Sequence, residues 1–278
     1  MLFLSRLAGV SVYATVLFAS FPAFAIDGVI EINQALAELG GVTPGDAPGY
    51  PVTITETGSY RLTSTLFLAK SQQGIYIDAD NVTIDLNGFS ISGPVTCTPG
   101  VAACSETVVN GALGIRADSA NFLTVKNGTV TGTGAGGVYC NPGVACVVEN
   151  VVVSHNNGNG ITIANSGRIS NCTAHSNRAN GMAVGKAAIV KNNTIHQNGF
   201  RGLLVSGDGA VVTSNVFSKN GMTEIDMGSR ITAIGGNTLD PVVNGNWFDN
   251  NSSGVMVEIS ANFCMDSSPA PHTNCTGL

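Results

Sequence analysis

A glycine followed by an apolar residue recurs at nearly constant spacing through the middle of the chain. Successive copies stand at Gly114, Gly137, Gly160, Gly181 and Gly202. An earlier copy, Gly74, precedes them after a longer interval, and Glu224-Ile225 follows Gly202 at the regular interval. A period of about 22 residues indicates stacked repeats, in which each unit buries its apolar face only against its neighbours.

Other columns of residues keep the same spacing. An asparagine column passes through Asn156, Asn177, Asn198 and Asn220, and Asn251 continues it after a longer interval. Eight positions before these asparagines lie Val148, Ile169, Val190, Val212 and Val243. Three positions before them lie Val153, Ala174, Ile195, Phe217 and Phe248, and five positions before them lie Val151, Cys172, Asn193, Asn215 and Asn246. We expect the apolar columns to form one continuous core.

The repeat excludes two other kinds of solenoid. The Leu-x-x-Leu-x-Leu pattern of leucine-rich repeats and the Gly-Gly-x-Gly-x-Asp runs of calcium-binding rolls are both missing from the sequence. What remains is a coil of short strands that turns through Gly and Asn and pairs with the next coil at about 4.8 Å. Asparagine suits such a coil because it tolerates the left-handed conformation of turns, and because stacked amides hydrogen-bond from coil to coil.

Several segments carry a resemblance to a known family. They are IDGVIEINQ at 26–34, VTPGD at 42–46, ADNVTIDLNGF at 79–89, KNGTV at 126–130 and NFC at 262–264 with Cys275. In these segments the sequence resembles the right-handed parallel β-helix repeat proteins of pectate-lyase-like architecture, and more narrowly secreted bacterial members whose function is mostly unassigned. The resemblance implies an all-β, single-stranded right-handed parallel β-helix, one repeat to each coil. It also implies a substrate groove along the outer face of the first parallel sheet.

The chain divides into four expected parts. Residues 1–25 contain Arg6, an apolar run over 7–18 and the Ala23-Phe24-Ala25 site of a secretory signal peptide, with a membrane anchor as the alternative. Residues 26–50 form an entry segment with a short capping helix over 31–39, 51–263 the β-helix, and 264–278 a disulfide-closed tail. The protein is therefore expected to be secreted, to the periplasm or beyond the cell, with no membrane span after cleavage.

Export makes the seven cysteines candidates for disulfides. The closest pairs are Cys97 with Cys104, Cys140 with Cys146, and Cys264 with Cys275, although six cysteines allow 15 pairings. Cys172 is left over and is expected to be buried and unreactive. The spacings do not match those of zinc sites.

Composition narrows the class of partner. Lys and Arg number 12 against 18 Asp and Glu, so the chain lacks the basic footprint of nucleic-acid binding. A hydrophobic content of 44% with a net charge of −6 does not fit a disordered chain.

The outward residues of the first sheet provide the main candidate site. Strand alternation predicts an outward column of Tyr76, Arg116, Tyr139, Thr162, Ala183, Leu204 and Asp226. We expect Arg116, Tyr139 and Tyr76 to bind a ligand in a cleft walled by the Cys97–Cys104 and Cys140–Cys146 loops. Arginine pairs with carboxylates and a tyrosine ring stacks on sugars, so the expected partner is an acidic polysaccharide or cell-surface glycan. The alternative is an exposed arginine whose stem packs over a tyrosine.

Two weaker candidates concern metals. His175 and His196 occupy one outward column on adjacent coils, where they are close enough to share a metal ion or a proton, although stacking alone also explains them. Asp78, Asp80 and Asp85 are candidate calcium ligands, with a solvated turn as the alternative. No other cofactor is expected.

Two function classes follow from these residues. The first is a non-catalytic β-helix that binds a glycan or another surface along its length. The alternative is a polysaccharide lyase or glycoside hydrolase with an unrecognised active site. Asp226 is the one carboxylate in the predicted outward column, whereas glycosidases use two. Of the polygalacturonase motifs Asn-Thr-Asp, Asp-Asp, Gly-His-Gly and Arg-Ile-Lys, only Arg168-Ile169-Ser170 approaches one, and the pectate-lyase motifs are not recognisable.

Overall fold

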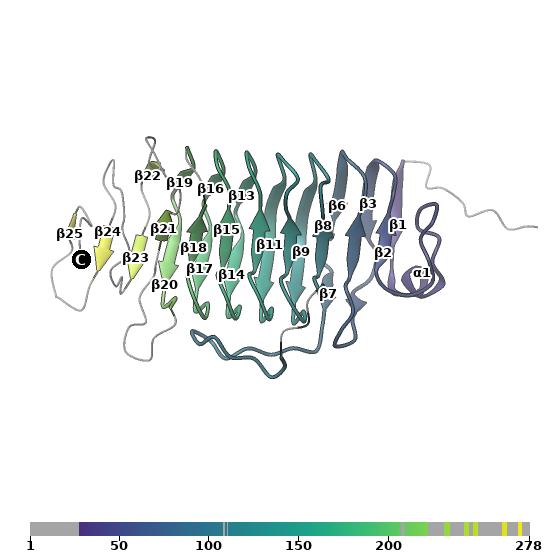
Figure 1. Cartoon of the computed structure of the whole chain (residues 1–278), viewed down its shortest axis with the longest axis horizontal. Coiled ribbons are helices and arrows are strands. Elements are labelled where there is room, and N and C mark those ends of the chain that lie inside the picture. Colours follow the sequence, from purple (N-terminus) through teal and green to yellow (C-terminus); the bar gives the residue numbers. More distant parts are fainter. Residues whose placement is uncertain are drawn as a thin grey trace, which may run out of the picture.

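The chain forms an all-β parallel solenoid with one short helix near its N-terminus (Figure 1). The computed structural model describes residues 28–107, 109, 111–206 and 209–221, and beyond these the backbone of strands at 231–233, 242–244, 247–249, 263–265 and 272–273. The predicted signal peptide and the Cys264–Cys275 pairing lie outside the described residues.

Each coil contributes one short strand to a parallel sheet of eight strands, which forms the first face of the solenoid. Its strands are β2 (Val52–Ile54), β5 (Ile75–Ile77), β8 (Ile115–Ala117), β10 (Val138–Cys140), β12 (Ile161–Ile163), β15 (Met182–Val184), β18 (Leu203–Val205) and β21 (Ile231–Ala233). In the strands from β2 to β18 the apolar residues at both ends point inward, as in β12, where Ile161 and Ile163 are buried and Thr162 is half-buried. This is the period-2 alternation expected of a strand.

A second sheet of 17 strands forms the other two faces. Its strands in the first half are β1 (Val29–Ile32), β3 (Gly58–Leu62), β4 (Leu66–Phe67), β6 (Val82–Asp85), β7 (Ser90–Ser92), β9 (Thr124–Thr131) and β11 (Val147–Ser154). From there it continues through β13 (Arg168–Ser170), β14 (Thr173–His175), β16 (Ile189–Lys191), β17 (Thr194–His196), β19 (Val211–Thr213) and β20 (Val216–Ser218). The remaining strands are β22 (Val242–Asn244), β23 (Trp247–Asp249), β24 (Phe263–Met265) and β25 (His272–Thr273).

The predicted columns coincide with the strand register. Val148 pairs with Ile169, Ile169 with Val190, and Val190 with Val212. The second apolar column follows the same rule through Val153, Ala174, Ile195, Phe217 and Phe248. The described members of both columns are buried and form one core, as expected.

The register departs from the prediction at the last coil of the first face. Leu204 pairs with Thr232, so Thr232 occupies the place in the outward column that was predicted for Asp226. The step from Leu203 to its partner Ile231 is longer than the regular repeat, because this coil carries additional residues. Asp226 itself lies outside the described residues.

A residue in the left-handed conformation, with φ between 53° and 59°, recurs at each of the three corners of the coil. At the first corner, after the strand of the first sheet, these residues are Ala145, Ser166 and Ala187. At the second corner they are Asn127, Asn150, Asn171, Asn192 and Ser214, and at the third corner, before the next strand of the first sheet, they are His155, Ser176, Gln197 and Lys219. The buried asparagine columns follow these residues by one position and do not themselves have positive φ. The expectation that they make the turns was therefore wrong, because it is their neighbours that do so.

The buried asparagines instead form a hydrogen-bonded ladder. Nδ2 of Asn156 donates to Oδ1 of Asn177 at 2.9 Å, and the same bond joins Asn177 to Asn198 at 2.9 Å and Asn198 to Asn220 at 2.8 Å. Each Nδ2 also donates to a backbone carbonyl, as from Asn177 to Val153 at 3.1 Å. A second ladder joins Asn193 to Asn215 at 2.9 Å and begins where the backbone N–H of Cys172 donates to Oδ1 of Asn193 at 2.8 Å. Stacked amides thus satisfy polar groups that burial would otherwise leave unpaired.

The repeat glycine is required because consecutive coils approach closely there. A Cβ atom on Gly160 would lie 2.6 Å from the carbonyl oxygen of Gly181 and 2.8 Å from Nδ2 of Asn177. Neither the backbone nor the ladder has room to move, so this column excludes side chains.

The helix α1 (Gln34–Leu39) covers the first coil at the N-terminal end of the solenoid (Figure 1). It is shorter than the predicted 31–39, because Glu31 and Ile32 pair with β3 as part of β1. Asn33 ends the strand and caps the helix, its Oδ1 accepting the backbone N–H of Leu36 at 2.9 Å. Ala37 buries the inner side of the helix in the core.

Two of the three expected disulfides, Cys97–Cys104 and Cys140–Cys146, are formed. Within the part of the chain that the structure describes, no helix is long and apolar enough to cross a membrane.

Candidate functional site

The first face brings together the three residues singled out from the sequence. Arg116 lies between Tyr76 and Tyr139 in the strand register, with one residue on each of three consecutive coils. Thr162, Ala183 and Leu204 extend the outward column over the next three strands. The six residues form a strip that spans five strand spacings, or about 24 Å. We call these six residues the outward strip.

Arg116 is engaged by a carboxylate that the sequence analysis did not single out. Its Nη2 lies 2.6 Å from Oδ2 of Asp118, and its Nε donates to Oδ1 of the same residue at 3.0 Å. The guanidinium carbon also lies 5.9 Å from the centre of the Tyr76 ring. The hydrogen bond to Asp118 raises the pKa of Arg116 further, so the arginine remains charged and paired. The sequence carried a signal for this pair, because Asp118 follows Arg116 by two positions and alternate residues share a face.

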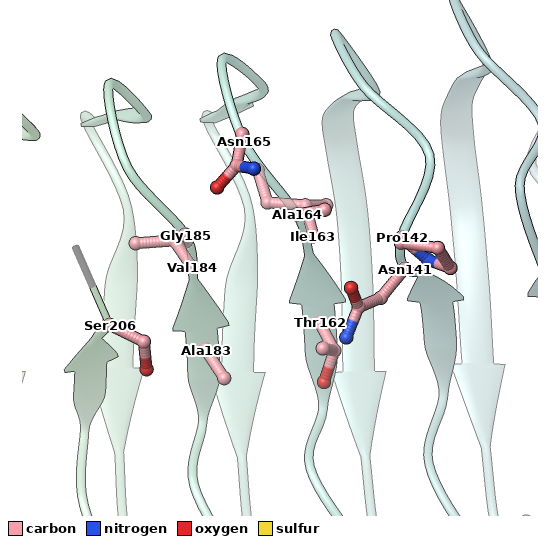
Figure 2. A pocket seen from close by; sticks show the side chains of 10 residues that line it. All are labelled: Asn141, Pro142, Thr162, Ile163, Ala164, Asn165, Ala183, Val184, Gly185 and Ser206. Carbon is pink, nitrogen blue, oxygen red and sulfur yellow. The ribbon is translucent and has the colours of Figure 1, made fainter.

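A shallow hollow adjoins the outward strip beyond Tyr139 (Figure 2). Its volume is about 240 Å³, and its floor includes the outward residues Thr162 and Ala183. The remaining lining residues are Asn141, Pro142, Ile163, Ala164, Asn165, Val184, Gly185 and Ser206. None of these side chains is ionisable, and Asn141, Thr162, Asn165 and Ser206 provide amide and hydroxyl groups. Sequence reasoning missed the hollow, because it arises from small residues at Ala183 and Gly185 beside a raised loop.

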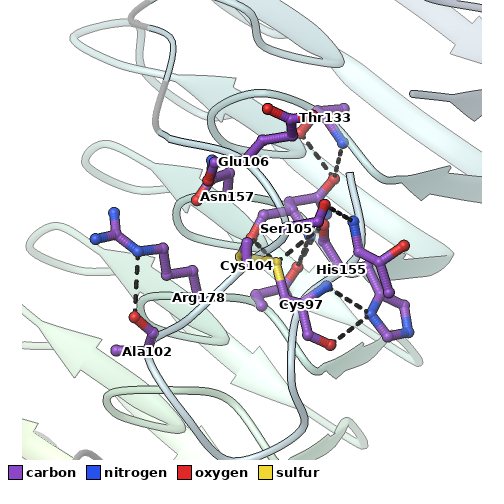
Figure 3. Close-up of a disulfide and its surroundings, with 12 residues drawn as sticks. Cys97, Ala102, Cys104, Ser105, Glu106, Thr133, His155, Asn157 and Arg178 are labelled. Carbon is purple, nitrogen blue, oxygen red and sulfur yellow. Dashed lines mark hydrogen bonds between the residues drawn. A yellow bond between two sulfur atoms is a disulfide. The ribbon is translucent and has the colours of Figure 1, made fainter. Parts of the chain in front are cut away.

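The two disulfide loops differ in their relation to the strip. The Cys140–Cys146 loop begins directly after Tyr139, and its residues Asn141 and Pro142 form one side of the hollow (Figure 2). The Cys97–Cys104 disulfide instead lies against the turns at the third corner, beside His155 (Figure 3). The expectation that both disulfide loops wall one cleft was therefore wrong for the Cys97–Cys104 loop.

Hydrogen bonds hold the Cys97–Cys104 loop across three successive coils. The backbone N–H of Cys97 lies 3.2 Å from Nδ1 of His155, and Nε of Arg178 donates to the carbonyl of Ala102 at 3.3 Å (Figure 3). The backbone N–H of Gly100 donates to the carbonyl of Gln197 at 2.6 Å. The loop thus covers turns of the solenoid and leaves the outer face of the first sheet open.

The histidine pair is stacked on the second sheet. His175 and His196 pair in register, and their rings are 9° from parallel with centres 5.1 Å apart. The nitrogen lone pairs lie in the ring planes, and because these planes are nearly parallel and stacked, the two nitrogens do not converge on one ion and neither ring can share a proton across its face. His155, which stands one position off this column in the sequence, meets His175 edge-on at 5.8 Å. Burial, followed by the neighbouring His196 and His155, lowers the pKa of His175.

The three candidate calcium ligands do not converge either. Asp80 accepts hydrogen bonds from the backbone and side chain of Asn121, at 2.7 and 3.2 Å. Asp85 accepts the backbone N–H of Asn87 at 2.9 Å and Nδ2 of Asn127 at 3.2 Å. Among the described residues, no group of three or more His, Cys, Asp or Glu side chains is placed to hold a metal ion.

Cys172 is a free, buried cysteine at the start of the second hydrogen-bonded ladder. Burial raises the pKa of its thiol to about 11. A thiol with this pKa forms little thiolate at neutral pH, which makes it a poor nucleophile and a poor metal ligand.

Comparison with known proteins identifies the fold family. The family model described as "Right handed beta helix region" matches residues 33–186 and 136–269. The chain belongs to this family. No curated protein matches it.

Two solved structures are similar at low identity. One is the crystal structure of the Agl-KA catalytic domain, with 14% identity, a TM-score of 0.44 and coverage of 68% of this chain and 41% of that one. The other is alginate lyase from Paenibacillus sp. str. FPU-7, with 13% identity, a TM-score of 0.46 and coverage of 80% and 76%. At these identities neither neighbour assigns an activity to this chain.

Proposed function

We propose that this protein is an exported, non-catalytic β-helix that binds a glycan on the outer face of its first sheet. The observation that carries the proposal is the outward strip, in which Tyr76, Arg116 and Tyr139 lie side by side and lead into a hollow lined by amides and hydroxyls. Aromatic rings offer flat apolar area for sugar rings, and amide and hydroxyl groups bond to sugar hydroxyls.

The shape of the site supports a chain-like ligand. The strip crosses six strands of a flat, open sheet, and a solenoid presents such an extended surface without a deep cavity. A polysaccharide can contact several coils at once, whereas a monosaccharide would cover one or two.

The chemistry of the strip supports binding without cleavage. Hydrolysis of a glycosidic bond uses two carboxyl groups, one on each side of the bond. Asp118 and Asp78 both lie beside the strip, on adjacent coils, but the two oxygens of Asp118 are engaged by Nη2 and Nε of Arg116, so the pair does not provide two available carboxyl groups. Export is supported by the N-terminal sequence pattern and by two disulfides, which persist in oxidising compartments.

The test is a binding and cleavage assay on the oxidised mature chain. Soluble polysaccharides of neutral and acidic type are titrated against the protein with and without calcium, and parallel incubations are analysed for new reducing ends and for unsaturated products. We expect saturable binding and no products. Tyr139→Ala should weaken binding at least about fivefold, which corresponds to about 1 kcal/mol for the loss of a contacting aromatic ring.

The matched control is Phe67→Ala. Phe67 is an exposed aromatic residue on β4, in the second sheet, and its loss should leave the affinity unchanged. Cleavage of any polysaccharide that Arg116→Ala abolishes would make the protein an enzyme and contradict the proposal. Equal losses in Tyr139→Ala and Phe67→Ala would place the binding surface elsewhere.

A further inference from the structure

We propose that the glycan bound by the outward strip is neutral, and that Asp118 sets this preference by occupying the guanidinium of Arg116. The inference rests on the proposed function and differs from the acidic ligand that the sequence suggested. An arginine beside tyrosines predicts a carboxylated sugar only if its guanidinium is available.

The ion pair occupies the Nε–Nη2 edge of the guanidinium, where a ligand carboxylate would form its two-point contact. Asp118 contacts Arg116 through both of its oxygens, one at Nη2 and one at Nε, which is the two-point geometry that arginine offers to a carboxylate. A uronate approaching Arg116 would have to displace Asp118 or lie beside its negative charge. Both side chains are about one-third exposed, at 36% and 33%, so solvent and ligand reach the pair.

The surrounding charge acts in the same direction. Tyr76 pairs with Arg116 on the next coil. Asp78 follows Tyr76 by two positions and Asp118 follows Arg116 by two positions, so the two carboxylates occupy equivalent places on adjacent coils. Two carboxylates and one guanidinium leave this end of the strip with a net negative charge. The whole chain carries a net charge of −6, which opposes the approach of a polyanion as well.

The hollow at the other end of the strip requires no charge from the ligand. Its polar groups are the side chains of Asn141, Thr162, Asn165 and Ser206, all of which are neutral. Amides and hydroxyls both donate and accept hydrogen bonds, as sugar hydroxyls do. A carboxylate, by contrast, would find no cation among the lining residues.

The experiment compares neutral and acidic polysaccharides as probes. The neutral probes are a mixed-linkage β-glucan, amylose and galactan, and the acidic probes are polygalacturonate and alginate, each titrated at low and high salt and with and without calcium. We expect the native protein to bind a neutral probe with an affinity that salt changes little, because no ion pair forms with the ligand. The acidic probes should bind at least about tenfold more weakly.

Asp118→Asn tests the role of the ion pair. This variant frees Arg116, and we expect binding of an acidic probe to strengthen at least about tenfold at low salt and to weaken again at high salt. Affinity for the neutral probe should change little. Glu149→Gln is the matched control, because it removes the carboxylate that faces Arg168 at 3.7 Å on the second sheet and should change no affinity. Arg116→Gln, which removes the cation, should fail to gain acidic binding.

The outcomes separate the two proposals. Tighter binding of polygalacturonate or alginate by the native protein, with or without calcium, would overturn the neutral ligand and leave glycan binding in place. A folded Asp118→Asn protein without any gain in acidic binding would overturn the role of Asp118. No binding of any probe by the native protein would overturn the proposed function, and the further inference with it.

Discussion

The early coils, residues 52–146, and the late coils, residues 147–221, follow the same three-sided path but are built differently inside and out. The late coils repeat at a nearly constant interval and carry buried asparagines that bond from coil to coil. The early coils have apolar interiors, with Leu86, Ile91 and Val125 fully buried. They also contain the longest glycine spacing, both disulfides and all three of Tyr76, Arg116 and Tyr139.

The first asparagine ladder ends at Thr133, which belongs to the early coils. Its hydroxyl donates to Oδ1 of Asn156 at 2.8 Å and thereby ends the asparagine ladder. A polar ladder needs the same residue on every coil, because each amide uses its neighbour as a partner. Regular repetition therefore indicates a structural constraint, whereas the irregular coils have room for the insertions and outward side chains that we assign to binding.

The largest expected effect breaks the ladder. Asn177→Ala removes the acceptor of both the Nδ2 and the backbone N–H of Asn156, as well as the donor to Val153. Buried polar groups without partners cost about 1–3 kcal/mol each, so we expect a loss of about 4 kcal/mol in the free energy of unfolding. Thr133→Ala, at the end of the ladder, should cost about 1 kcal/mol. Urea denaturation measures both, and equal losses would show that the ladder does not act as a connected unit.

The next effect concerns the glycine column, which the early and late coils share. Gly160→Ala in the late coils places a Cβ 2.6 Å from the carbonyl oxygen of Gly181, and Gly114→Ala in the early coils places one 2.7 Å from that of Gly137. Both should destabilise the fold by about 3 kcal/mol, because the contact is with backbone. Thermal denaturation compares them with Thr173→Ala on the surface-facing side of β14. A tolerated alanine at either glycine would contradict the close approach of the coils.

The smallest effect concerns the stacked histidines of the late coils. The folded pKa of His175 lies below its ordinary value of 6.5, so the unfolded chain takes up this proton first as the pH falls. Stability should therefore decline as the pH drops from 6.5 to the folded pKa and should not depend on this group above about pH 7. Denaturation at several pH values, with His175→Gln as the comparison, measures the slope. An identical slope in both proteins would exclude His175 as its cause.

The sequence was sufficient to predict the architecture because two constraints recur on every coil. The glycine column and the apolar columns predicted the register from Val148 to Phe217, and the one wrong assignment, Asp226, lay where a longer coil replaces one of regular length. Spacing cannot locate an insertion inside a coil. The stacked pair His175 and His196 was predictable for the same reason, since it lies in a regular column.

The site was less predictable because it depends on contacts outside the repeat. The outward position of Arg116 followed from strand alternation, and the same alternation put Asp118 on its face, but spacing alone does not show that the two side chains form an ion pair. The path of the Cys97–Cys104 loop and its contact with His155 join residues far apart in the chain, which no column relates. These contacts decide whether Arg116 is available to a ligand and whether the outer face of the first sheet stays open.

The most direct test is a crystal structure of the mature protein with the glycan that it binds best. We predict a sugar chain along the outward strip, with one ring stacked on Tyr76 or Tyr139, hydroxyls bonded to Asn141 or Thr162, and the ion pair between Arg116 and Asp118 intact. A glycan bound on the second sheet, or a cleaved product in the hollow, would contradict the assignment of this face as a non-catalytic binding surface.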